Sequence, residues 1–173
     1  EAGLPDGVFQ VINGSKEAVK AICDHPDIKA VAFVGSSKVA KIVYSRTTSQ
    51  GKRALCLGGA KNHMIVVPDA DIDSTAKGLL ASSMGSAGQR CMAASVAVGV
   101  ADVDPIIDQL IEEAKKYVLG VDMGTIISRP AFDRIKGYID NAENMGAKVL
   151  VDGRNSTPPE GYDNGYWLGP TIL

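Results

Sequence analysis

The sequence predicts an α/β fold with a largely parallel sheet covered by helices on both faces. Short apolar runs rich in Val, Ile and Ala alternate along the 173-residue chain with longer segments whose apolar residues recur at helical spacing. Glycine, proline and asparagine separate these runs. Strands that are joined through helices run parallel, and buried parallel strands have continuous apolar sequences like those seen here.

Seven apolar runs bounded by turn residues predict strands. They lie at residues 8–12, 30–34, 53–57, 64–67, 95–100 and 147–151, with a last strand within 167–173.

Five segments with apolar residues at helical spacing predict helices. They lie between Ser15 and Pro26, after Ser36-Ser37, and over 72–84, 105–119 and 130–145. The helix after Ser36-Ser37 is expected to turn Val39, Ile42 and Val43 inward.

The helix boundaries have their own signals. Asp104 followed by Pro105 predicts a capped helix start, and Ser128 with Pro130 predicts another. Gly146 is expected to end the second of these helices, because glycine readily adopts the left-handed conformation of a helix C-terminus.

Composition and charge exclude several classes of function. A net charge of −2 gives no basis for binding nucleic acid or an acidic membrane surface. No apolar run approaches ~20 residues, so no membrane-spanning helix is expected. The cysteines Cys23, Cys56 and Cys91 are odd in number and widely spaced, and His25 and His63 complete no metal-ligand pattern. Free thiols suit a reducing compartment, the cytoplasm or, in a eukaryote, the mitochondrial matrix.

Gly35-Ser36 is a candidate anion site, because it lies where a strand is followed by a helix. The free N–H groups of a helix N-terminus attract phosphate groups, and a glycine lets the ligand approach the backbone. The pattern is shorter than a full dinucleotide-binding motif. Taken alone, it is more typical of a capped helix after a tight turn than of an anion site.

Cys91 is a candidate nucleophile, because it follows a run of small residues that ends a helix. The positive charge of Arg90 favours the thiolate, which is the form that attacks a carbonyl carbon. Free cysteines are more often buried in a core, as expected for Cys23 on the apolar side of its helix. Chemistry alone leaves both interpretations of Cys91 open.

Three segments resemble motifs of the aldehyde dehydrogenase family, in the family's order and at about its spacing. Residues 31–36 (VAFVGS) resemble its F-x-G-S element, residues 57–62 (LGGAKN) its glycine-rich segment, and residues 88–91 (GQRC) its catalytic cysteine element. The resemblance implies Rossmann-like parallel sheets, a small-molecule aldehyde as substrate and Cys91 as the nucleophile. It also implies an NAD site, which would include Gly35, Ser36, Val39 and Gly58.

Within the family, residues 59–63 (GAKNH) and 88–93 (GQRCMA) resemble the branch that passes the acyl group of methylmalonate or malonate semialdehyde to CoA. Cys56 stands where other members have the glutamate that activates water, so CoA would replace water as acyl acceptor. Arg90 would pair with the substrate carboxylate. The alternatives are a hydrolytic aldehyde dehydrogenase and a non-catalytic fragment that retains the fold.

The resemblance also implies a domain division. Residues 1–57 would be the C-terminal part of an NAD-binding domain, and residues 58–173 the N-terminal part of a catalytic domain. Both ends of the sequence look abrupt, so we expect a truncated form of the aldehyde dehydrogenase fold. A truncated sheet would expose strand edges and apolar helix faces, which predicts a homo-oligomer.

Overall fold

The structure, a computed structural model, describes residues 2–173. The chain folds into two compact units, one ending at Ala60 and the other comprising Lys61–Leu173. This boundary lies close to the expected one at 57/58. The assignment of the units to an NAD-binding and a catalytic domain stays a prediction.

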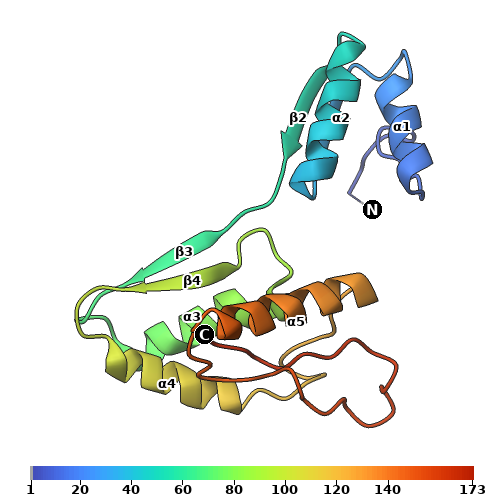
Figure 1. Ribbon diagram of the computed structural model, residues 1–173. Helices are drawn as coiled ribbons and strands as arrows, with labels where there is room; N and C mark the ends of the chain where they lie inside the picture. The colour runs from blue at the N-terminus through green and yellow to red at the C-terminus, as the bar shows by residue number, and fades with distance from the viewer. Residues whose placement is uncertain (1) are drawn as a thin grey trace. The chain divides into compact units, whose positions relative to one another are not determined.

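The first unit is a two-stranded parallel sheet with two helices. Its elements are α1 (Lys16–Asp24), β1 (Ala30–Val34), α2 (Ser37–Ser49) and β2 (Arg53–Leu57). The strands pair in register from Ala30 opposite Arg53 to Val34 opposite Leu57. Helix α2 packs along this sheet, and α1 packs against α2 (Figure 1). The parallel pairing confirms the α/β prediction for this unit.

Helices cover only one face of this sheet. The half-buried residues of β1 and β2 alternate with exposed ones, as the period of two in a strand requires. On the exposed face, Val34 is 67% and Leu55 62% accessible. The prediction that helices cover both faces is therefore wrong for residues 2–60, because no described element packs on the side of Val34.

The second unit also contains a two-stranded parallel sheet. Its elements are β3 (Asn62–Val66), α3 (Ile72–Met84), the short 3₁₀ helix η1 (Gly85–Gly88), β4 (Ala94–Gly99), α4 (Asp104–Lys115) and α5 (Arg129–Asn144). Strand β4 pairs with β3, and α3 packs against both α4 and β4 (Figure 1). The register shifts between Asn62 and His63, at the start of β3.

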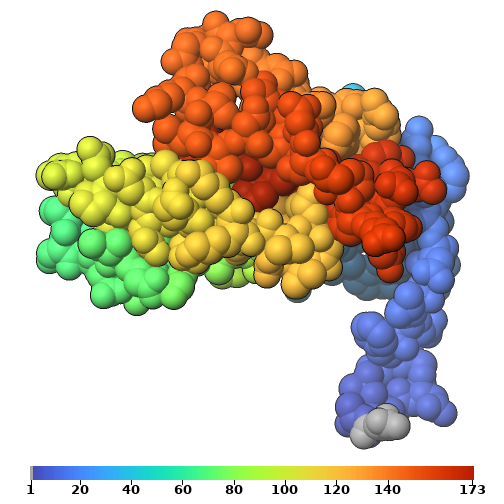
Figure 2. All heavy atoms as spheres, turned by 90° about the horizontal axis from the view of Figure 1, so that it is seen from below, coloured from blue at the N-terminus to red at the C-terminus, as the bar shows by residue number. Residues whose placement is uncertain are grey.

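The main core of the second unit lies where α3 and α4 meet β3. Its buried side chains are Val66, Ala76, Leu79, Leu80, Val103, Ile106, Leu110 and Ala114. Val151 and Ile172 pack against this core from the C-terminal part of the chain. In Figure 2 the surface of α4, in yellow, adjoins the surface of the C-terminal residues, in orange and red. A smaller cluster joins Ile126, Ala131 and Leu168.

Helix boundaries agree with most of the capping signals. The Ser128 hydroxyl accepts a hydrogen bond from the Ala131 N–H, and Gly146 follows α5 with a φ of 98°. Asp104 differs from the prediction, because it is the first residue of α4 and Val103 occupies the cap position. Ser15 precedes α1 but accepts no capping hydrogen bond.

Three of the predicted strands do not form, so these predictions are wrong. Residues 8–12 form no strand and are exposed, and residues 147–151 form only an isolated antiparallel bridge between Val151 and Ile172. The last expected strand, within 167–173, contributes only the other half of that bridge. A strand requires a partner for its N–H and C=O groups, and apolar composition alone cannot supply one.

The orientation of α2 also differs from the prediction. Its buried residues are Ala40, Val43 and Thr47, whereas Val39 is 40% accessible and Ile42 is exposed. The spacing i, i+3, i+7 places these three buried residues on the side that faces the sheet. Across residues 2–173, no helix combines the length and apolar character needed to cross a membrane.

Candidate active site

The turn between β1 and α2 exposes a helix N-terminus. The Gly35 N–H donates to the Leu57 carbonyl at 3.1 Å, which holds the turn against the end of β2. The Ser36 hydroxyl caps α2 by accepting from the Val39 N–H at 3.4 Å. Helix geometry leaves the N–H groups of Ser37 and Lys38 without intrahelical acceptors. These groups, at the positive end of a 13-residue helix, can bind an anion.

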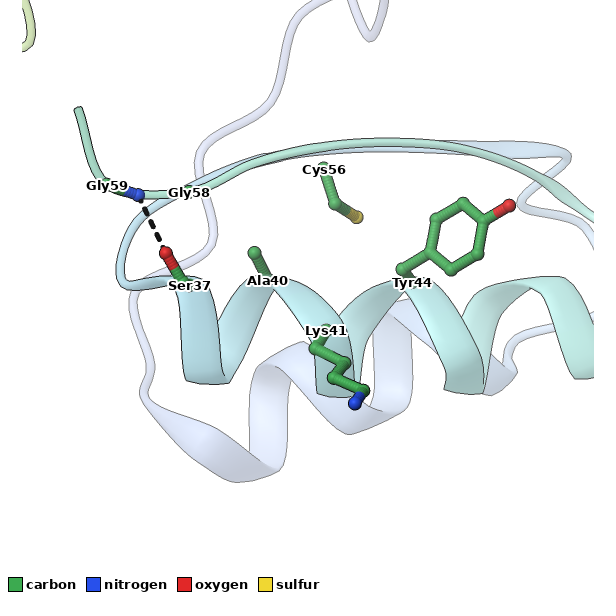
Figure 3. A pocket seen from close by; sticks show the side chains of 7 residues that line it. All are labelled: Ser37, Ala40, Lys41, Tyr44, Cys56, Gly58 and Gly59. Atoms are coloured by element: carbon green, nitrogen blue, oxygen red, sulfur yellow. Dashed lines mark hydrogen bonds between the residues drawn. The ribbon is translucent and has the colours of Figure 1, made fainter.

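A side chain at Gly58 would crowd the first turn of α2, because β2 ends close to Ser37. A Cβ atom at Gly58 would lie 2.7 Å from the Ser37 hydroxyl oxygen and 3.1 Å from the Ser37 Cα atom. This close approach lets the Gly59 N–H donate to the Ser37 hydroxyl at 3.0 Å (Figure 3). The structure thus brings Gly35, Ser36 and Gly58 to one end of α2, and Val39 follows in its first turn.

A pocket of about 420 Å³ lies beside α2 and β2 (Figure 3). Its lining residues are Ser37, Ala40, Lys41, Tyr44, Cys56, Gly58 and Gly59. Sequence reasoning missed Ser37, Lys41 and Tyr44, although their spacing of i, i+4 and i+7 on one helix face was a usable signal. Lys41 lies one turn into α2, and its side chain points away from Ser37 and Gly59 (Figure 3).

The turn that carries Cys91 has an unusual backbone. After α3, Ser86, Ala87 and Gly88 have φ angles of 54°, 53° and 69°. For Ser86 and Ala87 this left-handed conformation costs roughly 1–2 kcal/mol each. Such strain persists only where surrounding contacts hold it, and it clusters at functional sites.

Gln89 supplies contacts that hold this turn. Its side-chain amide donates to the Ser86 carbonyl at 3.2 Å and to the Thr125 carbonyl at 3.0 Å. Its side-chain oxygen accepts from the Ile127 N–H at 3.0 Å. All the groups of the Gln89 amide are therefore used in fixing the turn before Cys91.

Arg90 binds the end of α3. Its Nη2 group donates to the Ala81 carbonyl at 2.6 Å and to the Ser82 carbonyl at 3.2 Å. Both carbonyls belong to the last turn of α3, at the negative end of the helix dipole, and the Ala81 carbonyl also accepts the Gly85 N–H. Among residues 2–173, Nη2 is the only nitrogen of the Arg90 side chain that makes a hydrogen bond, and Nη1 and Nε make none.

Cys91 is the exposed cysteine, whereas Cys23 is buried and Cys56 is half-buried. It lies in an open depression of about 720 Å³ with Ala81, Ser82, Gln89, Arg90 and Met92. The structure thus brings Arg90 and Cys91 together in the second unit. It gives Cys91 the access to a small molecule that a nucleophile needs.

Sequence reasoning also missed Asn62. Its side-chain amide donates to the Cys91 carbonyl at 2.8 Å and to the Ala93 carbonyl at 3.0 Å. These contacts join residues about 30 positions apart, so no local pattern pointed to them.

The chain is similar in sequence to known dehydrogenases. A methylmalonate-semialdehyde dehydrogenase (acylating) of Arabidopsis thaliana is 48% identical over 179 residues, covering 100% of this chain and 29% of that protein. A malonate-semialdehyde dehydrogenase of Pseudomonas aeruginosa is 42% identical, covering 100% of this chain and 36% of that protein. The chain thus spans about a third of the length of these relatives.

Solved structures of dehydrogenases are also similar to this chain. A methylmalonate-semialdehyde dehydrogenase from Oceanimonas doudoroffii superimposes with a TM-score of 0.90 at 44% identity, covering 98% of this chain and 36% of that chain. A protein from Sinorhizobium meliloti 1021, assigned to the same activity and crystallised with NAD, has a TM-score of 0.90 at 46% identity over the same shares. The model of the aldehyde dehydrogenase family matches residues 1–173. The chain belongs to the aldehyde dehydrogenase family.

Proposed function

We propose that this chain carries the nucleophile and part of the NAD site of a CoA-acylating aldehyde dehydrogenase that acts on methylmalonate or malonate semialdehyde. One observation carries the proposal: Cys91 is exposed on a turn that side-chain hydrogen bonds hold in a strained conformation. The names and identities of the relatives support the choice of substrate and acceptor.

The first unit suits the pyrophosphate of NAD. The free N–H groups at the start of α2 would bind its phosphate oxygens, and Ser36 would add a hydroxyl donor. Gly35 and Gly58 keep this end of α2 free of side chains. NAD, when bound, supplies the acceptor for the hydride that leaves the substrate.

Cys91 would attack the aldehyde carbon through its sulfur, forming a bond to carbon while the carbonyl oxygen becomes an oxyanion. The Cys91 N–H has no acceptor among the described residues, so it is available to donate to that oxyanion. Loss of hydride from the same carbon leaves an acyl group in thioester linkage to Cys91.

The residue at position 56 indicates whether water or CoA takes the acyl group from the thioester. Cys56 stands where the resemblance places a water-activating glutamate. A thioester reacts readily with a thiol without such a base, so the thiol of CoA would take the acyl group and free Cys91. For methylmalonate or malonate semialdehyde, carbon dioxide is also released.

Arg90 would select substrates with a carboxylate, through its free Nη1 and Nε groups. Arg90→Leu should then reduce kcat/KM for methylmalonate semialdehyde roughly ten- to a hundredfold more than kcat/KM for propanal, because a hydrogen bond between charged groups contributes ~1.5–3 kcal/mol. An equal loss with both aldehydes would instead assign Arg90 to holding the Cys91 turn through Ala81 and Ser82.

An NADH-formation assay with methylmalonate semialdehyde, with and without CoA, tests the proposal. Turnover that requires CoA and disappears in Cys91→Ala is the expected result. Equal turnover without CoA would favour the alternative of a hydrolytic aldehyde dehydrogenase. NAD binding without turnover under either condition would favour the alternative of a non-catalytic chain that retains the fold.

Self-association and a reducing compartment, the cytoplasm or mitochondrial matrix, are part of the proposal. Val34, Leu55 and Ile65 are exposed on the two sheets, and apolar strand faces of this kind favour association with another copy. Sedimentation of the purified chain should therefore show a species heavier than the monomer. A single monomeric species at all concentrations would contradict this part.

A further inference from the structure

The side-chain amide of Asn62 donates hydrogen bonds to two backbone carbonyl groups at Cys91 and Ala93. The Asn62 Nδ2 group lies 2.8 Å from the Cys91 carbonyl oxygen and 3.0 Å from the Ala93 carbonyl oxygen. The two oxygens are acceptors only, so they use both hydrogens of the amide. One half-buried side chain therefore orients two of the three peptide groups that follow the sulfur-bearing residue.

The position of Asn62 in the sheet explains these contacts. The ladder between β3 and β4 ends where Asn62 lies opposite Ala94, and the register shifts at this point. Beyond the ladder the backbone of β3 no longer reaches the residues that precede β4. The Asn62 side chain continues the pairing there, as a side-chain substitute for a further pair of strand hydrogen bonds.

Few other hydrogen bonds hold the backbone of residues 91–94. Ala93 is buried, so an unpaired carbonyl at this residue would lose its hydration without a replacement donor. The Ala93 N–H donates to the Arg90 carbonyl at 3.2 Å and the Ala94 N–H to the Ser82 hydroxyl at 3.2 Å. These two bonds are long, and they should open more often once Asn62 is removed.

We propose that Asn62 is a positioning residue for Cys91. It fixes the backbone conformation after Cys91, and the backbone conformation sets the direction in which the Cys91 side chain points. The inference rests on the proposed role of Cys91 as nucleophile. A displacement of a nucleophile by about 1 Å can reduce a rate about a hundredfold, so the effect falls on kcat rather than on binding.

Hydrogen–deuterium exchange of the 173-residue chain tests the contact without requiring catalysis. Asn62→Leu has a similar volume and no donor. It should speed exchange within residues 90–95 about tenfold and leave α4 (104–115) unchanged. Asn62→Asp has the same shape and no donor at neutral pH, and it replaces the leucine variant if that variant does not fold. Asn164→Leu, in an exposed loop, is the matched control and should leave both segments unchanged.

Steady-state kinetics test the positioning role. The donor-lacking variants should lower kcat about ten- to a hundredfold, with unchanged KM for the aldehyde and unchanged Kd for NAD. Asn62→Gln retains the amide and should recover part of the loss. Unchanged exchange, or faster exchange with an unchanged kcat, overturns the inference. If the wild-type chain oxidises no aldehyde but the variants still exchange faster, the hydrogen-bonding role of Asn62 is supported. In that case only the proposed function is refuted.

Discussion

The side-chain oxygen of Gln89 accepts a hydrogen bond from the Ile127 N–H at 3.0 Å, across 38 positions of sequence. The neighbouring residue, Ile126, is buried beside Ala131 and Leu168. Gln89 therefore connects the strained turn before Cys91 to the smaller core of the second unit. The conformation of the nucleophile's turn depends on this core as well as on its own residues.

Removing the Gln89 amide should destabilise the second unit. Gln89→Leu breaks all three hydrogen bonds of the side chain. We expect a loss of about 1 kcal/mol, because Ile127 and Thr125 are exposed and water can replace part of each bond. Gln89→Glu keeps the acceptor for Ile127 and loses both donors, so its stability should be intermediate. Urea unfolding measures the stability of both variants. Gln50→Leu is the control, because Gln50 is exposed and its side chain makes no hydrogen bond among the described residues. A Gln89→Leu variant as stable as wild type would contradict the role of Gln89.

Cys91 should be the first thiol to react with iodoacetamide. It is exposed, whereas Cys23 is only 1% accessible and Cys56 is half-buried in β2. Limited labelling of the native chain followed by peptide mapping measures the order. The Cys91→Ser variant should lose the fast phase, and preferential labelling of Cys23 or Cys56 would refute the assignment of the nucleophile.

Ala101→Gly should stabilise the chain. Ala101 is exposed and has a φ of 57°, a conformation that strains any residue with a Cβ atom and does not strain glycine. Relief of this strain, reduced by the greater freedom of glycine in the unfolded state, should leave a gain of about 0.5 kcal/mol. Thermal unfolding measures it. Ala147→Gly is a control at an exposed position without a positive φ, and a gain there as large as at Ala101 would rule out the strain explanation.

Asp152 should contribute stability that acid removes. Hydrogen bonds from the Arg154 side chain, and then from the Arg154 N–H, lower the pKa of Asp152 from 3.8 to about 2. Because the pKa in the folded state lies below the unfolded value, the contribution is complete above pH ~4 and disappears as the pH falls towards 2.

Asp152→Asn should therefore be less stable than wild type at pH 7, and the difference should shrink between pH 4 and pH 2. Urea midpoints at pH 7, 4 and 2.5 measure this. Asp163→Asn, in an exposed loop, provides the comparison. A difference that stays constant from pH 7 to 2.5 would show that the pairing with Arg154 does not depend on the charge of Asp152.

The sequence by itself determined those features whose causes lie within a few residues. The strands at 30–34 and 53–57 and the helix at 72–84 have the predicted bounds. Apolar periodicity, glycine breaks and the Ser128 cap act locally and can be interpreted without knowing the rest of the fold. The family motifs belong to the same group, because their residues are contiguous.

Only the tertiary structure decided which of these local features found partners. Residues 8–12 have the composition of a strand and no strand beside them, so they remain exposed. The burial of Ala40 rather than Val39 depends on the angle at which α2 meets its sheet. Asn62 reaches Cys91 across 29 positions, and such contacts arise from the packing of whole elements, which no local pattern encodes.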